Sequence, residues 1–323
     1  MSDNHRISGI HHITAIASSA SENLAFYEKV LGLRLVKKTV NFDDPYTYHL
    51  YYGDAAGTPG TIITFFPWEN LPRGKAGAGM VTAVAFAIPT GAVDYWRARL
   101  SAHGVETKEG ERFGDAFIQF ADPHGLSLEL IETPQLQSDS HQSDGARSAS
   151  EGIVGFHSAT ALLRSLEQTR HLLVSLMGME LRGTEGDRYR FKMKDDQAFG
   201  HFYDVVVNPQ AKSGQQGGGT VHHIAFRTPT DDAQIYWQRF IADNGFAVTP
   251  IRNRKYFKSI YFHEPGGILF EIATDPPGFT VDEPYERLGH DLKLPDQYEH
   301  MRSEIESRLP GLKASPAKQL ITN

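Results

Sequence analysis

Short segments of alternating apolar and polar residues recur four times along the chain, and a longer amphipathic segment interrupts each group. The alternating segments predict β-strands, and the longer ones predict helices at 21–31, 90–103, 165–177 and 230–244. Each predicted helix begins near a Ser or Thr that can cap it, and a glycine suited to a left-handed C-terminal cap follows. These glycines are Gly32, Gly104, Gly178 and Gly245. The repeating unit is therefore predicted to be a βαβββ module.

The module boundaries follow from breaker-rich segments between the repeats. The four modules are predicted at about 8–68, 80–133, 152–208 and 219–275. A longer polar stretch of Ser, Gln and Asp marks a linker between two halves. The predicted organisation is an N-terminal half at 1–134, a linker at 135–151, a C-terminal half at 152–276 and a tail at 277–323. The tail is expected to carry a surface helix at 296–309 that ends before Pro310.

Composition narrows the classes of function. The chain has 323 residues, 40% of them hydrophobic, so it can bury a large core. It contains no cysteine, which excludes disulfides, thiolate metal sites and cysteine nucleophiles. A net charge of −7 argues against a nucleic-acid partner. Because no long apolar run or leader is present, we expect a cytoplasmic protein with no membrane partner, and a homodimer is the default oligomer.

Two pairs of adjacent histidines recur at matching places in the repeat. The position of the second histidine reads His12, Ala83, Ser158 and His223 in the four modules. A glutamate position near the end of the module reads Thr64 in the first, Glu129 in the second and Glu271 in the fourth. The third module has its counterpart near Tyr203 and Asp204, where it is too diverged for a confident match. The sequence therefore predicts His12, His223 and Glu271 as metal ligands and leaves Glu129 isolated.

Two imidazoles and one carboxylate leave coordination positions open, which suits a ferrous ion that binds an organic chelator and dioxygen together. Zinc or manganese would accept the same atoms. Successive residues on a strand face opposite sides, so only one histidine of each pair can face a shared cavity with regular geometry. If it is the second in both pairs, the first module must lie beside the fourth.

Several of these residues could have a structural role in place of a functional one. A single strand histidine is more often a hydrogen-bonded core residue than a ligand. Recurrence of the pair favours ligation at His12 and His223, whereas Glu129 is interpreted as a structural or surface residue. His157 is expected to be packed and hydrogen bonded. His49 is equally consistent with a pocket wall and with the core.

The modules resemble the vicinal oxygen chelate superfamily, which includes glyoxalase, bleomycin-resistance and extradiol dioxygenase proteins. Nearly the whole chain resembles, more narrowly, the ring-cleaving hydroquinone dioxygenases, the family of the enzyme that opens 2,6-dichlorohydroquinone. The matching segments are GIHHIT (9–14), YHLYY (48–52), GTPGT (57–61), RFG (112–114), VHHIAF (221–226), RKYFKSIY (254–261), GGILFE (266–271) and GFTVDE (278–283).

The resemblance implies an α+β fold whose four βαβββ modules form two pseudo-symmetric open β-barrels with outer helices. It implies an active cavity between the first and fourth modules, with Fe(II) on the three predicted ligands, and a degenerate cavity between the other two modules. Mn(II), Zn(II) or Ni(II) could substitute for Fe(II). The catalytic residues that it implies near the substrate are His11, Thr14, His222, Arg254 and Tyr261.

The function implied is Fe(II)-dependent, extradiol-type ring cleavage of a hydroquinone, so a small aromatic substrate and O₂ are the expected partners. His222 or His11 could remove the hydroxyl proton, while Arg254 offers a positive charge and Tyr261 a hydrogen bond. Strict alternation turns the first histidine of each pair away from the metal, so a bulge or a wall shared between sheets is needed for it to reach the substrate.

Two other classes of function remain open from the sequence. The first is a non-redox divalent-metal isomerase, lyase or thiol transferase of the glyoxalase kind. Such sites usually keep a second carboxylate ligand, and Thr64 stands in its place. The second is a small-molecule sequestering protein like the bleomycin-resistance binders, which needs neither four modules nor a metal triad.

Overall fold

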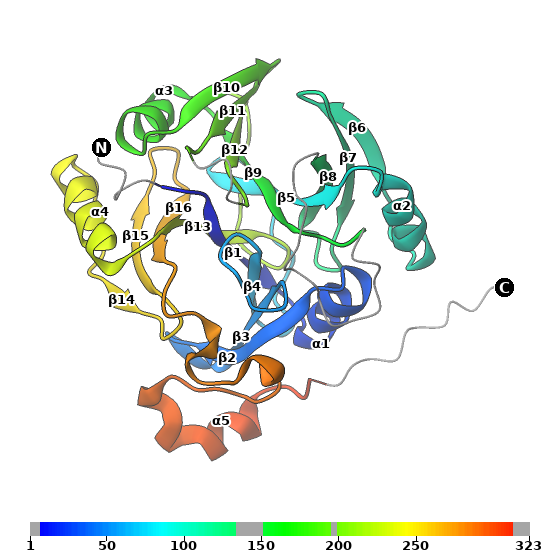
Figure 1. Ribbon diagram of the computed structural model, residues 1–323, viewed down its shortest axis with the longest axis vertical. Coiled ribbons are helices and arrows are strands. Elements are labelled where there is room, and N and C mark those ends of the chain that lie inside the picture. Colours follow the sequence, from blue (N-terminus) through cyan, green and yellow to red (C-terminus); the bar gives the residue numbers. More distant parts are fainter. Residues whose placement is uncertain (1–6, 134–150, 195–198, 313–323) are drawn as a thin grey trace.

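The computed structural model describes residues 7–133, 151–194 and 199–312, whose strands form two curled eight-stranded sheets (Figure 1). The first sheet has the order β14 (Arg252–Asn253), β15 (Lys258–His263), β16 (Leu269–Thr274), β13 (Val221–Thr228), β1 (Ile10–Ala17), β4 (Ile62–Pro67), β3 (Asp44–Gly53), β2 (Arg34–Asn41). The second has the order β10 (Glu180–Glu185), β11 (Arg188–Lys192), β12 (Phe202–Val207), β9 (Gly155–Leu163), β5 (Met80–Pro89), β8 (Ser127–Thr133), β7 (Asp115–Ala121), β6 (Lys108–Arg112).

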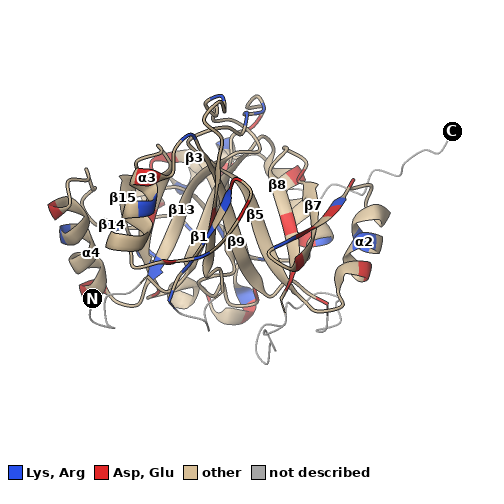
Figure 2. Cartoon of the chain, turned by 90° about the horizontal axis from the view of Figure 1, so that it is seen from above, with Lys and Arg blue, Asp and Glu red and all other residues tan. Residues whose placement is uncertain are grey.

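Each sheet joins one module from the N-terminal half of the chain to one module from the C-terminal half. The first sheet combines the first and fourth modules through antiparallel β1 and β13, and the second combines the other two through antiparallel β5 and β9. Seen from above, β13 and β1 run beside β9 and β5 between α4 at one end and α2 at the other (Figure 2). This confirms the α+β fold of four modules in two open barrels. Residues 135–150 of the predicted linker lie outside the described residues, so the domain boundaries stay predictions.

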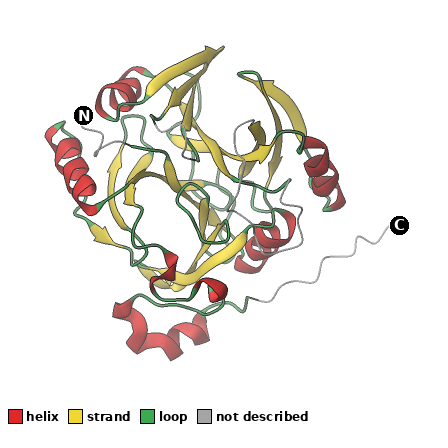
Figure 3. Cartoon of the chain, in the orientation of Figure 1, coloured by secondary structure: helices red, strands yellow, loops and turns green. Residues whose placement is uncertain are grey.

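The helices lie around the outside of the sheets (Figure 3). They are α1 (Ala20–Ala25) with the π-helix η2 (Phe26–Val30), α2 (Val93–Ala102), α3 (Glu167–Arg170) with the π-helix η3 (His171–Leu176), and α4 (Asp231–Asp243). All four glycines predicted to end them have positive φ, between 66° and 88°. None of the helices in the described part of the chain is long and apolar enough to cross a bilayer.

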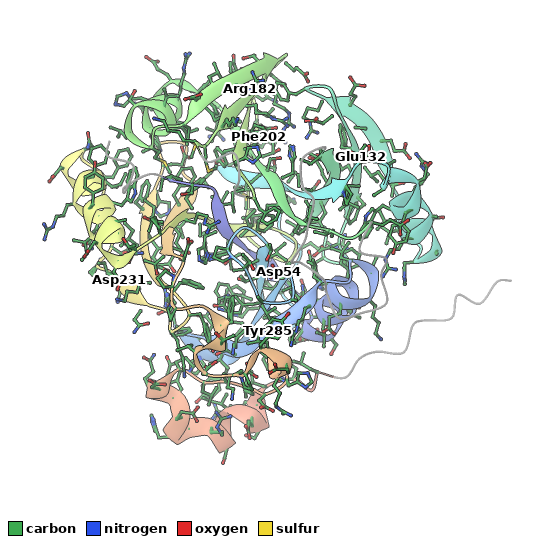
Figure 4. The ribbon with its side chains drawn as sticks, in the orientation of Figure 1. Asp54, Glu132, Arg182, Phe202, Asp231 and Tyr285 are labelled. Atoms are coloured by element: carbon green, nitrogen blue, oxygen red, sulfur yellow. The ribbon has the colours of Figure 1, made fainter. Side chains whose placement is uncertain are left out.

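Side-chain capping follows the sequence prediction in only two of the four helices. Ser19 caps α1 and Thr230 caps α4, whereas α2 and α3 have no side-chain cap at the N-cap residue. At the start of α2, Oε1 of Glu132 in β8 accepts hydrogen bonds from the amides of Gly91 and Val93 at 2.8 and 3.1 Å. Glu132 is labelled in Figure 4. A carboxylate from another element therefore takes the place of a local cap.

After the repeat, residues 277–312, here called the C-terminal strap, pass along the first sheet at β2 and β3 (Figure 1). The strap contains the 3₁₀ helices η4 (Phe279–Val281), η5 (Tyr285–Arg287) and η6 (Asp296–Met301), followed by α5 (Arg302–Arg308). The predicted tail helix is thus present as a 3₁₀ turn that continues into an α-helix. Tyr285 marks the strap in Figure 4, and its carbonyl accepts a hydrogen bond from Arg34 of β2 at 2.8 Å.

Candidate metal centre

A bulge in each of the two central strands brings the paired histidines to one side. The register between β1 and β13 shifts at His11 and again at His222, so each of these residues is an extra one in its strand. A bulge breaks the strict alternation of side chains. As a result, the Nδ1 atoms of His11 and His12 lie 3.0 Å apart, and those of His222 and His223 lie 2.8 Å apart.

The three predicted ligands meet across the junction of the first and fourth modules. Nε2 of His12 lies 3.3 Å from Oε2 of Glu271, and Nε2 of His223 lies 2.9 Å from the same oxygen. The potential ligand atoms all lie within 4.8 Å of one another, and among the described residues no other group of His, Asp and Glu has this geometry. The side chains are 2%, 6% and 0% exposed in the order His12, His223, Glu271.

The remaining hydrogen bonds of these residues leave the atoms of a metal site available. Nδ1 of each histidine bonds its neighbouring histidine, and Oε1 of Glu271 accepts from Ser259. Oε2 of Glu271 is buried and has no hydrogen bond among the described residues. Burial alone raises the pKa of Glu271, but His12 and His223 outweigh it and hold the pKa well below its usual value. Two nitrogens and one ionised oxygen thus converge as a donor set that fits a divalent metal.

A cavity of about 350 Å³ opens beside the triad. Its polar walls include His222, Arg254 and Tyr261, three of the predicted catalytic residues, together with His12 and His223. Its remaining walls are Asn41, Phe42, Asp43, His49, Tyr51, Phe66, Trp68, Phe257 and Leu269. Largely aromatic walls with a few polar groups are typical of a site for a small aromatic molecule.

Two predicted catalytic residues do not line this cavity. His11 is 1% exposed, and its ring packs 5.0 Å from that of Phe257, which forms part of the cavity wall and covers His11. Thr14 is fully buried, and its hydroxyl bonds that of Thr64 on β4 at 2.9 Å. Neither side chain lines the cavity wall, and the prediction that both lie against the substrate stays a prediction: His11 hydrogen bonds with His12, and Thr14 with Thr64.

Arg254 and Tyr261 form a polar edge of the cavity. Nε of Arg254 donates to the Tyr261 hydroxyl at 3.2 Å, and its guanidinium lies 3.4 Å from the Asp43 carboxylate. Burial lowers the pKa of Arg254, but Tyr261 and the nearby carboxylates outweigh it and raise the pKa overall. Burial, followed by Glu271, raises the pKa of Tyr261. Arg254 is therefore a permanent cation, and the phenol keeps its proton.

The family model of the Glyoxalase/Bleomycin resistance protein/Dioxygenase superfamily matches residues 9–130 and 155–280, which is most of the chain. The chain belongs to this superfamily. The curated relative "Putative ring-cleaving dioxygenase MhqO" of Bacillus subtilis is 49% identical over 93% of this chain and 95% of its own length. The chlorohydroquinone/hydroquinone 1,2-dioxygenase of Sphingobium indicum is 34% identical over 93% of this chain and 95% of its own.

Solved structures agree with this membership of the superfamily. The crystal structure of a dioxygenase from Bacillus subtilis, described as putative, superposes with a TM-score of 0.92 at 47% identity, over 96% of this chain and 99% of the other. Glyoxalase I from Zea mays has a TM-score of 0.62 at 13% identity, over 87% and 96% of the two chains, which shows a shared fold alone. The curated relatives make the protein an enzyme, a ring-cleaving dioxygenase, as the sequence predicted.

Several cavity residues of this superfamily member were not predicted. His49, which the sequence left open, lines the cavity with Tyr51, and both point to the same side of β3. Alternation along β3 is a signal for that pairing. No local sequence pattern predicted that Asp43 and Trp68 line the cavity. They lie in loops after β2 and β4, and the tertiary fold determines where these loops lie.

The second sheet has carboxylates at the glutamate position of the repeat but Ala83 and Ser158 in place of the second histidine of each pair. Glu129 faces Ala85 on β5, and Asp204 faces Thr160 on β9, as Glu271 faces Ala225 in the first sheet. The third module's carboxylate position is thus Asp204, which the diverged sequence located only approximately. Arginines bind both acids: Arg112 contacts Glu129 at 2.8 and 3.0 Å, and Arg190 contacts Asp204 at 2.9 and 3.1 Å. Guanidinium groups therefore neutralise the carboxylates in this sheet, and Glu129 is structural.

Replacing Glu129 by glutamine is expected to lower the free energy of unfolding by about 1–3 kcal/mol. The amide oxygen can still accept one bond, but Arg112, whose side chain is 12% exposed, loses its charged partner. Metal content should not change, since Glu129 belongs to the other sheet. Urea denaturation and metal analysis of the purified variant check both statements, and a loss of metal would contradict the structural role.

Proposed function

We propose that the protein is an Fe(II)-dependent extradiol-type dioxygenase that uses O₂ to cleave the ring of hydroquinone or a substituted hydroquinone. The observation that carries the proposal is the His12–His223–Glu271 triad, which leaves metal positions open toward an aromatic cavity. The name of the Sphingobium indicum relative supports this substrate class. Zn(II), Mn(II) or Ni(II) could occupy the same donor set.

The non-redox glyoxalase-like alternative has less support from the geometry. Thr64 stands where the first module would supply a second carboxylate, and its hydroxyl is held by Thr14 and His49 at 2.9 and 2.8 Å. Its hydroxyl therefore belongs to a hydrogen-bond chain, and it supplies no second carboxylate of the kind that such sites usually keep.

The aromatic walls suit a planar ring. Phe66, Trp68 and Phe257 contribute rings to the cavity, and Phe257 lies with its ring 4.9 Å from that of His12. Such surfaces hold an aromatic substrate through stacked or edge contacts. The substrate would be desolvated directly beside the triad, where one of its oxygens can reach the metal.

When bound by His12, His223 and Glu271, Fe(II) would supply a redox-active Lewis acid to which substrate and O₂ can both bind. His222 contributes a hydrogen bond: with Nε2 of His223 on the metal, Nδ1–H of His223 must donate to Nδ1 of His222. Burial, followed by His223, lowers the pKa of His222 to about 4, so it is neutral and carries its single proton on Nε2.

His222 is therefore a donor to an oxygen in the cavity, whereas the sequence favoured it, or His11, as the group that removes a proton. Arg254 would stabilise the negative charge that develops during cleavage. The Tyr261 hydroxyl accepts from Arg254 and also hydrogen bonds with Ser259, whose own proton goes to Glu271. His222 and Arg254 give the cavity a donor-rich edge that favours anionic substrate and product.

The proposal is tested by O₂ uptake after anaerobic reconstitution with Fe(II), using a panel of hydroquinones and catechols. We expect iron-dependent uptake and a new chromophore from the ring-opened product, with hydroquinones preferred. Protein loaded with Zn(II) and the His12→Ala variant serve as controls and should be inactive. Absence of uptake from a sample that holds one iron per chain would overturn the proposal.

A further inference from the structure

We propose that the Tyr51 hydroxyl donates a hydrogen bond to the distal oxygen of the substrate, the one para to the metal-bound oxygen. A buried chain of Thr14, Thr64 and His49 orients this donor. The inference rests on the proposed hydroquinone chemistry, and it explains which contact selects a para-dihydroxylated ring.

This chain of hydrogen bonds runs from the interior of the first sheet to the cavity wall. The Thr14 and Thr64 hydroxyls lie 2.9 Å apart, Nε2 of His49 lies 2.8 Å from the Thr64 hydroxyl, and Nδ1 of His49 lies 2.8 Å from the Tyr51 hydroxyl. Both threonines are fully buried, and Tyr51 and His49, which line the cavity, are 1% and 8% exposed. The hydrogen-bond chain thus links an internal hydroxyl to a phenol in the cavity wall.

The number of protons available in this hydrogen-bond chain decides which residue donates to which. Burial, and then the nearby histidines, lowers the pKa of His49 well below its usual value, so the neutral ring has one N–H. If Nε2 carries it, the hydrogen bonds run toward Thr14, whose own proton then finds no acceptor among the described residues. A buried donor without an acceptor is costly, so this direction is disfavoured.

In the opposite direction every buried proton is used. Thr14 donates to Thr64, Thr64 donates to Nε2 of His49, and Nδ1–H of His49 donates to the Tyr51 oxygen. The proton of Tyr51 is then left for the cavity. Burial raises the pKa of Tyr51 well above its usual value, so the phenol remains a donor at neutral pH.

The position of Tyr51 suits the far end of the ring. β3 is separated from β1, which carries His12, by β4, and two strand spacings are roughly 10 Å. A ring with oxygens at opposite ends spans such a distance better than one with oxygens on neighbouring carbons. The Tyr51 ring is also fixed in place, since its centroid lies 5.3 Å from that of Phe279 and 6.1 Å from that of Tyr256.

The test compares binding of hydroquinone and 4-methylphenol, in which a methyl group replaces the distal hydroxyl, to Fe(II)-loaded protein without O₂. We expect the wild-type protein to prefer hydroquinone and Tyr51→Phe to lose about tenfold of that preference. Tyr256→Phe is the matched control: its hydroxyl donates to Asp282 in the strap at 3.1 Å, outside the cavity wall, so the preference should persist.

A second pair of variants tests the chain itself. Thr64→Val interrupts it and should also reduce the preference, whereas Thr64→Ser keeps a hydroxyl and should retain it. Equal weakening of both ligands in Tyr51→Phe, or an unchanged preference in Tyr51→Phe and Thr64→Val, would overturn the role of Tyr51. Failure of the wild-type protein to consume O₂ with hydroquinone would instead count against the proposed function.

Discussion

Replacing Glu271 by glutamine is expected to leave the protein with far less than one metal ion per chain and to reduce turnover at least about a thousandfold. Glu271 is the only anionic member of the triad, and its Oε2 lies 3.3 Å and 2.9 Å from the two histidine nitrogens. The amide has the same shape but no charge to offset a dication in a fully buried position. Even residues that only hydrogen bond to a ligand change metal affinity by about 10–100-fold, so a ligand should matter more.

The control for this variant lies in the second sheet. Glu129→Gln makes the same chemical change at the equivalent strand position, opposite Ala85 as Glu271 is opposite Ala225. It should keep its metal and its activity. Metal analysis after dialysis, together with O₂ uptake at saturating Fe(II), measures both properties. If Glu271→Gln binds metal as well as Glu129→Gln, the triad is not the metal site.

Repetition within the sequence made the convergence of His12, His223 and Glu271 and the pairing of modules predictable. The histidine pairs mark equivalent strands in the first and fourth modules, so convergence of His12, His223 and Glu271 required those modules to be neighbours. The structure has this arrangement, with β1 and β13 paired antiparallel. The bulges at His11 and His222 were also foreseeable, because a regular strand cannot turn both histidines of a pair to one side.

Contacts between distant elements were not predictable in the same way. Local sequence suggests a cap near Thr90, but Glu132 from β8 binds the first amides of α2. Asp204 could not be aligned from the sequence, and only its position opposite Thr160 reveals it as the counterpart of Glu271. The hydrogen bond between the hydroxyls of Thr14 and Thr64 likewise joins two strands that are far apart in the sequence.

Replacing Lys37 by methionine is expected to lower the free energy of unfolding by about 3–5 kcal/mol. Lys37 lies in β2 and is 0% exposed, and its ammonium group binds Asp282 at 2.6 Å and also binds Glu283. Both acids belong to the C-terminal strap, and Glu283 is 2% exposed. Methionine has a similar volume but leaves the buried Glu283 without its cation and, among the described residues, Asp282 with only Lys255, whose Nζ lies 3.5 Å from Oδ2.

The loss should appear first in the strap. Glu283 also accepts hydrogen bonds from the amides of Gly289 and Asp291, so it organises the strap around Lys37. Phe279, three residues before Asp282, packs against Tyr51 of the cavity wall. Hydrogen exchange in the strap should therefore accelerate in Lys37→Met before the sheets unfold, and the midpoint of urea denaturation should fall.

The neighbouring Lys38 offers a matched control for this variant. Within the described part of the chain its ammonium group donates to the carbonyl of His290, at 2.9 Å and in an exposed position, so Lys38→Met should change stability by no more than about 0.5 kcal/mol. The two variants remove the same charge from adjacent residues of one strand. Equal stability would mean that the buried ion pairs do not hold the strap, and that its apolar contacts, such as those of Phe279, fix it against the first sheet.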